Sequence, residues 1–251
     1  MGKNNPLYGS LGSDQDKYIP GVIISCVVFC FESGRLKLLL CNSKWLGKWV
    51  LPGGLISYNE GADDAVRRIL KEKIGVKQPY LKQFHFFCNK GRIDIDGSEN
   101  TDYSTTPRSI NLAYYSFVRA DELKLSETDA DGLRWFPICD CSFAHEDHQE
   151  IIYTCISSIR KQIGFLPIGY KLLSEKFTMP ELRTIYESIL DRNIDRRNFQ
   201  RKILSIGCVK PLDEKRSIGG RGHKSPNLYR FEKKIYEEAE EQGLQLMTNN
   251  L

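Results

Sequence analysis

Hydrophobic residues in the first two thirds of this 251-residue chain recur in short runs that are typical of β-strands. The runs 21–31 and 36–42 are rich in Val, Ile, Leu and Phe and flank the sequence ESGR, which predicts two strands joined by a turn. Similar runs predict further strands at 80–89, 111–120 and 133–138. Strands therefore dominate this part of the chain.

Two helices are predicted among these strands. One is expected at Ala62–Lys73, after the Pro-Gly-Gly break in WVLPGGLI, and the other from about Asp147 to Gln162. Asp147 and Glu150 have the D-x-x-E spacing of a helix cap at the start of the second helix. Mixed strands with a helix on each face predict an α/β/α sandwich.

The pattern changes after residue 163, where IGFLPIG is typical of a linker. The segment Thr178-Met-Pro-Glu181 then forms a capping box with proline in the first turn of a helix. Apolar residues follow it at helical spacing, at positions 182, 185, 186 and 189. These features predict a small second domain that begins with an amphipathic helix.

Three further elements complete this second domain. Asp195 is a good N-cap for a second helix at 195–206. The segment 208–231 is typical of a β-hairpin with the glycine-rich tip GGRGHKSP, and 233–243 is expected to be a short terminal helix. The order helix, turn, helix and hairpin resembles a winged helix-turn-helix.

Charge is concentrated in this second domain. The net charge of +4 is by itself too small to indicate a nucleic-acid partner. Between residues 176 and 234, however, there are 15 Lys and Arg against 7 Asp and Glu. The C-terminal segment is therefore the basic part of the chain.

The helix at 195–206 has the residues to contact DNA. Phe199, Ile203 and Ile206 share one face, so the basic side chains point away from it. Arg and Gln can read guanine and adenine edges in the major groove, and the hairpin tip would touch the backbone or minor groove. A small helical cap with a solvated charged face is the alternative. We expect base contacts from Arg197, Gln200 and Arg201, and phosphate or minor-groove contacts from Arg196, Lys202, Arg221, His223 and Lys224.

Residues 54–76 match most of the catalytic pattern G-x5-E-x7-R-E-U-x-E-E-x-G-U, in which U is an apolar residue. Two of its glutamates are replaced, because Ile69 follows the arginine and Lys73 stands at the last Glu position. The residues on matching positions are Gly54, Glu60, Arg68, Leu70, Glu72, Gly75 and Val76.

The replaced glutamates bear on metal binding. In the intact pattern the carboxylates lie three and four residues apart on one helix face and converge on a divalent cation beside a diphosphate. This helix supplies Glu72 alone, which is a weak anchor for Mg²⁺, and the positive charge of Lys73 opposes a cation. The sequence therefore favours a domain without catalytic residues, metal or other cofactor.

The stretch resembles the Nudix box, and the resemblance to the Nudix superfamily extends over about residues 20–163. With its basic winged helix, the chain is similar to the Nudix-related transcription regulators of bacteria. The resemblance implies a Nudix-type α/β/α sandwich with a small C-terminal winged helix-turn-helix domain. We expect a flexible leader at 1–19, a sensor domain at 20–163, a linker at 164–168 and a DNA-binding domain at 169–243.

In that family the Nudix-like domain senses a metabolite, and dimers bind palindromic operators. The resemblance implies an enzymatically inactive homodimer that binds double-stranded operator DNA and responds to a pentose sugar or an ADP-ribose-like effector. Arg68, Glu72 and His148 are the expected effector-binding residues, although His148 is equally consistent with a satisfied structural histidine. No apolar run reaches the roughly 18 residues of a membrane span, so a cytoplasmic protein without membrane contact is expected.

The alternative is an active hydrolase of nucleoside-diphosphate sugars such as ADP-ribose. Glu60 and Glu72 would then bind the metal, together with acids of the polar loop between two strands, Asp94, Asp96, Glu99 and Asp102. A domain that binds RNA is a third hypothesis, which the absence of an aromatic stacking pattern disfavours.

Cysteine and histidine positions suggest packing more than chemistry. The eight cysteines include no C-x2-C pair and are expected to be reduced core residues, with a redox or metal role for Cys26 and Cys30 or for Cys139 and Cys141 as the alternative. His85 lies in an apolar run and is expected in the core.

Overall fold

The computed structural model describes residues 18–43, 47–88, 110–119, 132–139, 142, 144, 146–164, 168–216 and 225–242. The chain divides into two compact units. The first comprises Met1–Cys30, Lys37–Val118 and Glu122–Cys155, and the second comprises Phe31–Leu36, Arg119–Asp121 and Ile156–Leu251. None of the helices among these residues has the length and apolar character to span a membrane.

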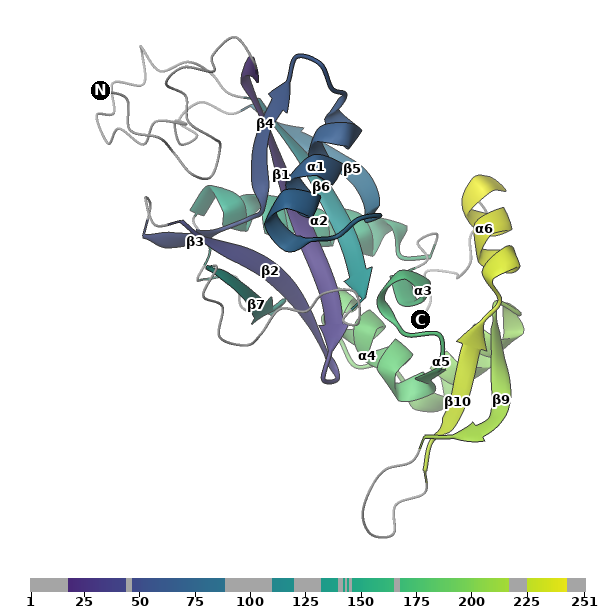
Figure 1. Ribbon diagram of the computed structural model, residues 1–251. Helices are drawn as coiled ribbons and strands as arrows, with labels where there is room; N and C mark the ends of the chain where they lie inside the picture. Colours follow the sequence, from purple (N-terminus) through teal and green to yellow (C-terminus); the bar gives the residue numbers. More distant parts are fainter. Residues whose placement is uncertain are drawn as a thin grey trace. The chain divides into compact units, whose positions relative to one another are not determined.

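A sheet of seven strands with two helices forms the first fold (Figure 1). The strand order is β3-β2-β1-β6-β5, with β4 paired to β1 and β7 paired to β2. Figure 1 shows α1 in front of this sheet and α2 behind it. The strands are β1 Tyr18–Glu32, β2 Arg35–Ser43, β3 Lys48–Val50, β4 Gly53–Ser57, β5 Tyr80–Phe87, β6 Ile110–Arg119 and β7 Leu133–Pro137, and the helices are α1 Ala62–Ile74 and α2 Glu146–Gln162.

A three-stranded sheet and four helices form the second fold. The sheet order is β8-β10-β9, and both pairs are antiparallel. Its elements are α3 Ile168–Leu172, β8 Phe177–Thr178, α4 Met179–Leu190, α5 Arg196–Ser205, β9 Val209–Lys215, β10 Asn227–Phe231 and α6 Lys233–Gln242.

Apolar faces hold α4 and α5 together. Ile185 of α4 and Phe199 of α5 are buried, and the rings of Tyr186 and Phe199 lie 5.6 Å apart between their centroids. Burial of each such side chain stabilises the domain by about 1.5–3 kcal/mol. Asp191 ends α4 in the left-handed conformation and Asp195 caps α5, so the turn between them is short. This is the helix-turn-helix that the sequence predicted.

The main elements of both folds agree with the sequence predictions. Helix α1 was expected at 62–73 and helix α5 at 195–206. Both expectations lie within one residue of the observed ends. The capping box at Thr178 is present, with Glu181 N donating to Thr178 Oγ1 and Thr178 N to Glu181 Oε2. Strong local signals therefore fixed these elements.

Several details of the sequence interpretation were wrong. Helix α2 begins at Glu146, so Asp147 lies inside its first turn rather than at the cap. His85 is exposed on β5, and so is its neighbour Phe86, because β5 lies at the edge of the sheet and has a neighbouring strand on one side. Cys88 and Cys139 are also exposed, whereas the other described cysteines are buried; none of the described cysteines forms a disulfide, and Cys141 lies outside the described residues.

Helix α3 was not predicted, because its first residues lie in a segment that looked like a linker. Gly169 explains how this helix packs, since a Cβ atom there would lie 2.3 Å from Leu182 Cδ1. Glycine thus lets α3 approach α4 closely. Ile168 and Leu172 of α3 are buried as well.

Candidate functional site

Helix α1 carries the modified box and is positioned by its two ends. Asp63 and Asp64 lie in the first turn, where negative charge is favourable, and Gly75 ends the helix in the left-handed conformation. The hydroxyl of Tyr114 on β6 donates to Asp63 Oδ1 at 2.8 Å and so ties the start of α1 to the sheet. This contact could not be predicted, because its two partners are far apart in the chain.

Arg68 and Glu60 form the strongest polar contact of the box. Arg68 donates from Nε to Glu60 Oε2 at 3.0 Å and from Nη2 to Glu60 Oε1 at 2.6 Å. Arg68 Nη2 also donates to the Leu55 carbonyl at 2.9 Å, and the Ser57 N–H donates to Glu60 Oε1 at 2.8 Å. The hydrogen bonds from Arg68, with that from Ser57, lower the pKa of Glu60. This pair fastens β4 and the following turn to α1.

Ile69 stands where the box pattern has a glutamate, and its side chain packs in the interior. Its side chain is 2% exposed and fills the space beside Gly54, where a Cβ atom would lie 3.1 Å from Ile69 Cδ1. A carboxylate at this depth would need a partner to offset its desolvation. The isoleucine therefore completes the contact between α1 and β4 instead of offering a ligand.

Lys73 lies one turn after Ile69 on the same helix face. Its side chain is half-buried, and burial lowers the pKa of its ammonium group. Lys73 interacts electrostatically with Cys41 on β2, and burial raises the pKa of the Cys41 thiol to about 11. The cysteine is therefore a neutral neighbour, and the lysine brings positive charge to a position where a metal-binding site needs negative charge.

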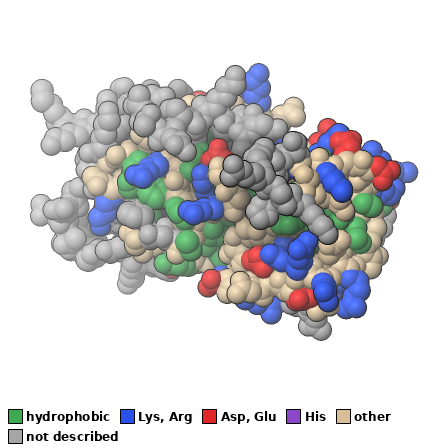
Figure 2. Space-filling model, turned by 90° about the horizontal axis from the view of Figure 1, so that it is seen from below, with side chains coloured by type: hydrophobic (Ala, Val, Ile, Leu, Met, Phe, Trp, Pro, Cys, Tyr) green, Lys and Arg blue, Asp and Glu red, His purple; other side chains and the backbone are tan. Residues whose placement is uncertain are grey.

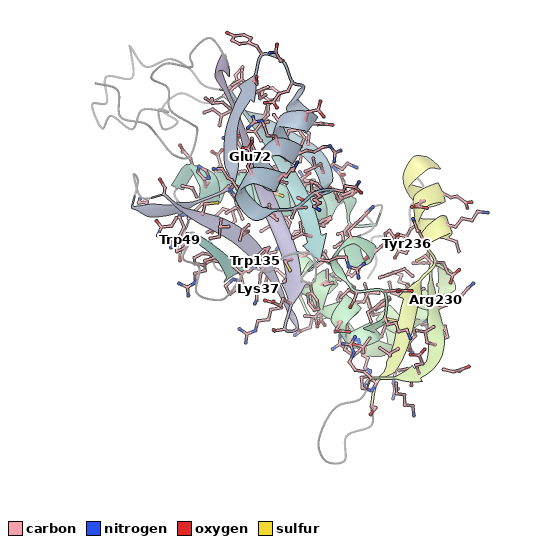
Figure 3. All side chains as sticks on the ribbon, in the orientation of Figure 1. Lys37, Trp49, Glu72, Trp135, Arg230 and Tyr236 are labelled. Carbon is pink, nitrogen blue, oxygen red and sulfur yellow. The ribbon has the colours of Figure 1, made fainter. Side chains whose placement is uncertain are left out.

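The residues of the box do not fit a divalent metal ion. Glu60 is engaged by Arg68, and Glu72 is 60% exposed with its carboxylate 3.4 Å from Arg68 Nη1 (Figure 3). Among the residues that the structure describes, no three His, Cys, Asp or Glu side chains are grouped so that they could hold a metal ion. The loop acids of the hydrolase alternative, Asp94, Asp96, Glu99 and Asp102, lie outside the described residues.

His148 has a structural contact at the start of α2. It is buried, and its Nδ1 accepts a hydrogen bond of 2.9 Å from the Leu51 N–H, just before the Pro-Gly-Gly turn. Of the three expected effector residues, the structure brings Arg68 and Glu72 together on α1, while His148 supports the chain segment that leads into β4.

The second candidate site is the outer face of α5. Arg196 and Arg197 are exposed and form no ion pair with any other described residue. Arg201 is exposed and donates to Asn198 Oδ1 at 3.1 Å, and Lys202 is half-buried. The helix thus presents a row of arginines to solvent.

Gln200 lies apart from this row of arginines. Its Nε2 donates to the hydroxyl of Tyr229 on β10 at 3.2 Å, and its side chain is half-buried. The amide is thus partly used within the domain and does not project freely with Arg197 and Arg201. The expected contacts from the hairpin tip, Arg221, His223 and Lys224, lie outside the described residues.

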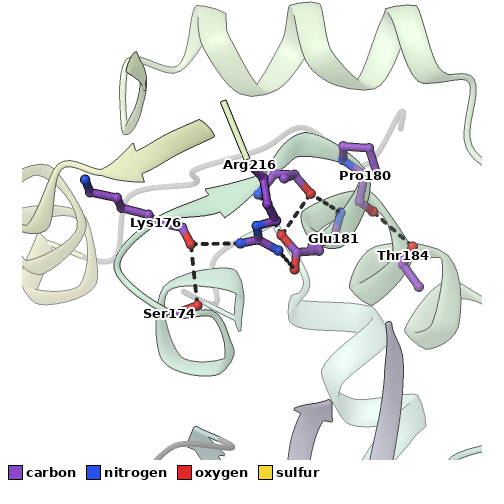
Figure 4. Close-up of polar contacts among 7 residues, drawn as sticks. Ser174, Lys176, Pro180, Glu181, Thr184 and Arg216 are labelled. Atoms are coloured by element: carbon purple, nitrogen blue, oxygen red, sulfur yellow. Dashed lines mark hydrogen bonds and ion pairs between the residues drawn. The ribbon is translucent and has the colours of Figure 1, made fainter. Parts of the chain in front are cut away.

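Arg216, at the base of the hairpin, is held by the start of α4 (Figure 4). Its guanidinium forms an ion pair with Glu181 through Nη1 and donates from Nη2 to the Lys176 carbonyl at 3.2 Å. Glu181 belongs to the capping box of α4, so one carboxylate serves both the helix cap and the hairpin base. This arrangement fixes where the hairpin leaves the domain.

The described Lys and Arg side chains are scattered over the face that Figure 2 draws. On the face drawn in Figure 2, Lys and Arg side chains lie among hydrophobic and polar ones, with Asp and Glu interspersed. The positions of individual arginines therefore matter more than the total charge for any contact with a polyanion.

Two family models match the chain in the order of its two folds. The NUDIX domain matches residues 20–155, and the NrtR DNA-binding winged helix domain matches residues 169–231. The ADPR responsive transcriptional repressor NtrR of Acinetobacter baylyi is 24% identical over 230 residues, which cover 87% of this chain and 84% of that protein.

Solved structures are similar over most of the chain. NrtR of Shewanella oneidensis, in a crystal structure with a 27mer DNA, is 26% identical and has a TM-score of 0.68. The match covers 86% of this chain and 95% of that one. A MutT/nudix family protein from Enterococcus faecalis shares the fold at 21% identity and a TM-score of 0.60, over 85% and 87% of the two chains. The chain therefore belongs to the Nudix family, and within it to the Nudix-related transcriptional regulators that join a Nudix domain to a winged helix-turn-helix.

Proposed function

We propose that this protein is a transcriptional regulator that binds operator DNA through α5 and the hairpin and responds to a small effector through the Nudix domain. The observation that carries the proposal is the pairing of two features in one chain. The box helix has Ile69 and Lys73 where metal ligands are needed, and the second domain presents exposed arginines on a helix-turn-helix. The similarity to NrtR of Shewanella oneidensis over 86% of the chain supports the same function.

The Nudix domain is proposed to be without hydrolase activity. Hydrolysis of a diphosphate by this chemistry depends on a metal ion that orients the phosphates and activates water. The described residues offer Glu72 as an exposed carboxylate, while Glu60 is committed to Arg68. A pocket that has lost its metal ligands can still bind a ligand, which is what a sensor requires.

Operator recognition is assigned to the arginines of α5. Arg197 and Arg201 are exposed and can reach base edges in the major groove, although Arg201 also donates to Asn198, and Arg196 is placed to contact a phosphate. We propose that the protein is a homodimer and that its operator is palindromic, because two recognition helices related by a two-fold axis contact half-sites about 34–36 Å apart or a multiple of that spacing.

The proposed effector is ADP-ribose or a related pentose compound. The name of the Acinetobacter relative, ADPR responsive, supports ADP-ribose first. Arg68 and Glu72 are the proposed effector contacts, and we assign His148 the role of supporting the turn before β4, because its Nδ1 accepts from Leu51. An effector changes DNA binding only if it binds the DNA-bound and free conformations unequally.

Fluorescence anisotropy of the full chain on labelled DNA tests the proposal. DNA from upstream of the protein's own gene and its neighbours is compared with scrambled DNA, first alone and then with ADP-ribose or ribose. The expected result is sequence-specific binding that one of these compounds weakens or strengthens at least ten-fold. Equal affinity for the upstream DNA and the scrambled DNA would contradict the proposal that the protein is a regulator.

The hydrolase alternative has its own assay. The full chain and Glu72→Gln are incubated with ADP-ribose and Mg²⁺, and AMP is measured. No AMP above background is expected from either protein. Magnesium-dependent release of AMP that Glu72→Gln abolishes would establish an enzyme, whatever the result with DNA.

A further inference from the structure

A pocket in the second unit lies between the start of α4, the start of α5 and β10, and its volume is about 170 Å³. Its buried wall is apolar and is formed by Met179, Phe199 and Tyr229. Polar side chains surround the opening, with arginines from two helices and Asn227 from the first position of β10. Its described lining residues all belong to the second unit.

The arginines give the pocket a positive charge. Arg183 of α4 and Arg196 of α5 both line it, and its described lining contains no acidic residue. The first residues of α4 line the pocket too, so the positive ends of both helix dipoles are directed near it. An anion is therefore the ligand that this pocket favours.

Arg183 has hydrogen-bonding capacity to spare. Its side chain is 27% exposed, and its Nε lies 3.4 Å from Glu187 Oε1. That contact is an ion pair without a hydrogen bond, because no described acceptor meets the geometry for Arg183 Nε. Glu187 Oε1 instead accepts from the Ile194 N–H at 2.9 Å. A buried donor in this state is unsatisfied until a ligand supplies an acceptor.

Strand pairing and a hydrogen bond hold the wall of the pocket in place. Tyr229 pairs with Phe177 of β8 and with Pro211 of β9, and its hydroxyl accepts from Gln200 of α5. Gln200 thus braces the pocket against β10 instead of projecting with the base-reading arginines. A preformed site binds with less loss of conformational entropy.

We propose that this pocket seats one sugar–phosphate unit of the operator backbone, with Arg183 and Arg196 around the phosphate and the apolar wall against the deoxyribose. The proposal rests on the proposed DNA-binding function and adds residues outside the recognition helix to it. Arg196 begins α5 directly before Arg197, so a phosphate in the pocket lies at the end of the helix that enters the major groove. Arginine matches phosphate geometry with two parallel hydrogen bonds.

The salt dependence of DNA binding by Arg183→Gln is the test. Each phosphate contact contributes about 0.9 to the slope of log K against log salt. The variant should lower that slope by about 0.9 and weaken binding about five-fold at 0.15 M salt, equally for operator and scrambled DNA. The ratio of the two affinities should stay unchanged, because a phosphate carries no sequence information.

Arg230→Gln is the matched control. Arg230 follows Tyr229 on β10, so its side chain points to the opposite face of the strand (Figure 3). The substitution removes an ion pair similar to that of Arg183, because Arg230 Nε lies 3.3 Å from Glu232 Oε1. The slope of log K against log salt for Arg230→Gln should stay within about 0.3 of the wild-type slope, which is roughly a third of the contribution of one phosphate contact. Asn227→Asp is the second variant, which keeps its size, adds a negative charge at the opening and should weaken binding most at low salt.

Three outcomes overturn the proposal. The first is an unchanged slope in Arg183→Gln with an intact thermal transition, and the second is an equal loss of slope in Arg230→Gln. The third combines two results: calorimetry shows that the DNA-free protein binds pyrophosphate and that Arg183→Gln abolishes this binding, while the variant leaves the salt dependence of DNA binding unchanged. This result would make the pocket a site for a free phosphate compound. Failure of the wild-type chain to prefer operator DNA would instead contradict the proposed function.

Discussion

The pair of Arg68 and Glu60 allows a quantitative prediction for Glu60→Gln. Both carboxylate oxygens of Glu60 accept hydrogen bonds, Oε1 from Arg68 Nη2 and Ser57 N and Oε2 from Arg68 Nε. Glutamine keeps one acceptor oxygen, and its NH₂ group must face one of these donors in either orientation. The variant therefore loses a charge-assisted contact and leaves a donor unsatisfied.

The expected loss is about 2 kcal/mol of unfolding free energy. Hydrogen bonds to charged groups contribute about 1.5–3 kcal/mol. The lower half of that range applies because Glu60 is 16% and Arg68 31% exposed, so solvent screens part of the interaction. For a chain of this size the loss corresponds to a fall in Tm of about 4–8 °C. Scanning calorimetry and urea unfolding at pH 7 measure both quantities.

The effect should depend on pH in a defined direction. The pKa of Glu60 is lowered by its hydrogen bonds from Arg68, so the folded protein holds the charged carboxylate more strongly than the unfolded chain does. The stabilisation is complete above the unfolded pKa of about 4.3 and is lost as the pH falls through the folded pKa. The difference between wild type and Glu60→Gln should therefore shrink in acid.

Glu72→Gln is the control for this prediction. Glu72 contacts the same arginine, but it is 60% exposed and 3.4 Å from Arg68 Nη1. Its loss should change stability by about 0.5 kcal/mol or less. Equal stability of Glu60→Gln and wild type at pH 7, or a difference that persists unchanged in acid, would refute the reasoning.

Three further predictions concern base reading by Arg197, the contact of His148 and the dependence on metal ions. Arg197→Ala should cost about 1–3 kcal/mol of operator affinity and relax preference at one base pair, and uniform weakening on all DNA would contradict base reading. His148→Ala should cost about 1–3 kcal/mol of stability in urea unfolding, since the Leu51 N–H is left buried without its acceptor. EDTA should leave both the Tm and the proposed response to ADP-ribose unchanged, because no three described His, Cys, Asp or Glu side chains are grouped so that they could hold a metal ion. A shift of either one would show a metal site.

Local signals in the sequence were reliable where their partners lie within one helical turn. Asp195 accepts from the Asn198 N–H at 2.8 Å, and the capping box of α4 joins Thr178 to Glu181. Such contacts depend on spacing along the chain alone, so the pattern predicts them. The burial of Phe199 and Ile203 followed from helical periodicity in the same way.

Contacts between distant segments could not be predicted. Tyr114 of β6 contacts Asp63 of α1, and Gln200 of α5 contacts Tyr229 of β10. The pattern placed Gln200 among the base-reading residues because its spacing puts it near the exposed face of α5. Only the position of β10 reveals that its amide is partly used inside the domain.

The sequence by itself determined the order of the two folds, the loss of two carboxylates from the box and the concentration of positive charge in the second domain. These properties depend on residue identity and spacing. The tertiary structure decided which charged groups are committed and which are free, because that depends on partners from other elements. Carboxylates hold Arg68 and Arg216, whereas Arg197 is exposed to solvent. Arg183 lines a pocket, and its Nε donates no hydrogen bond to a described residue.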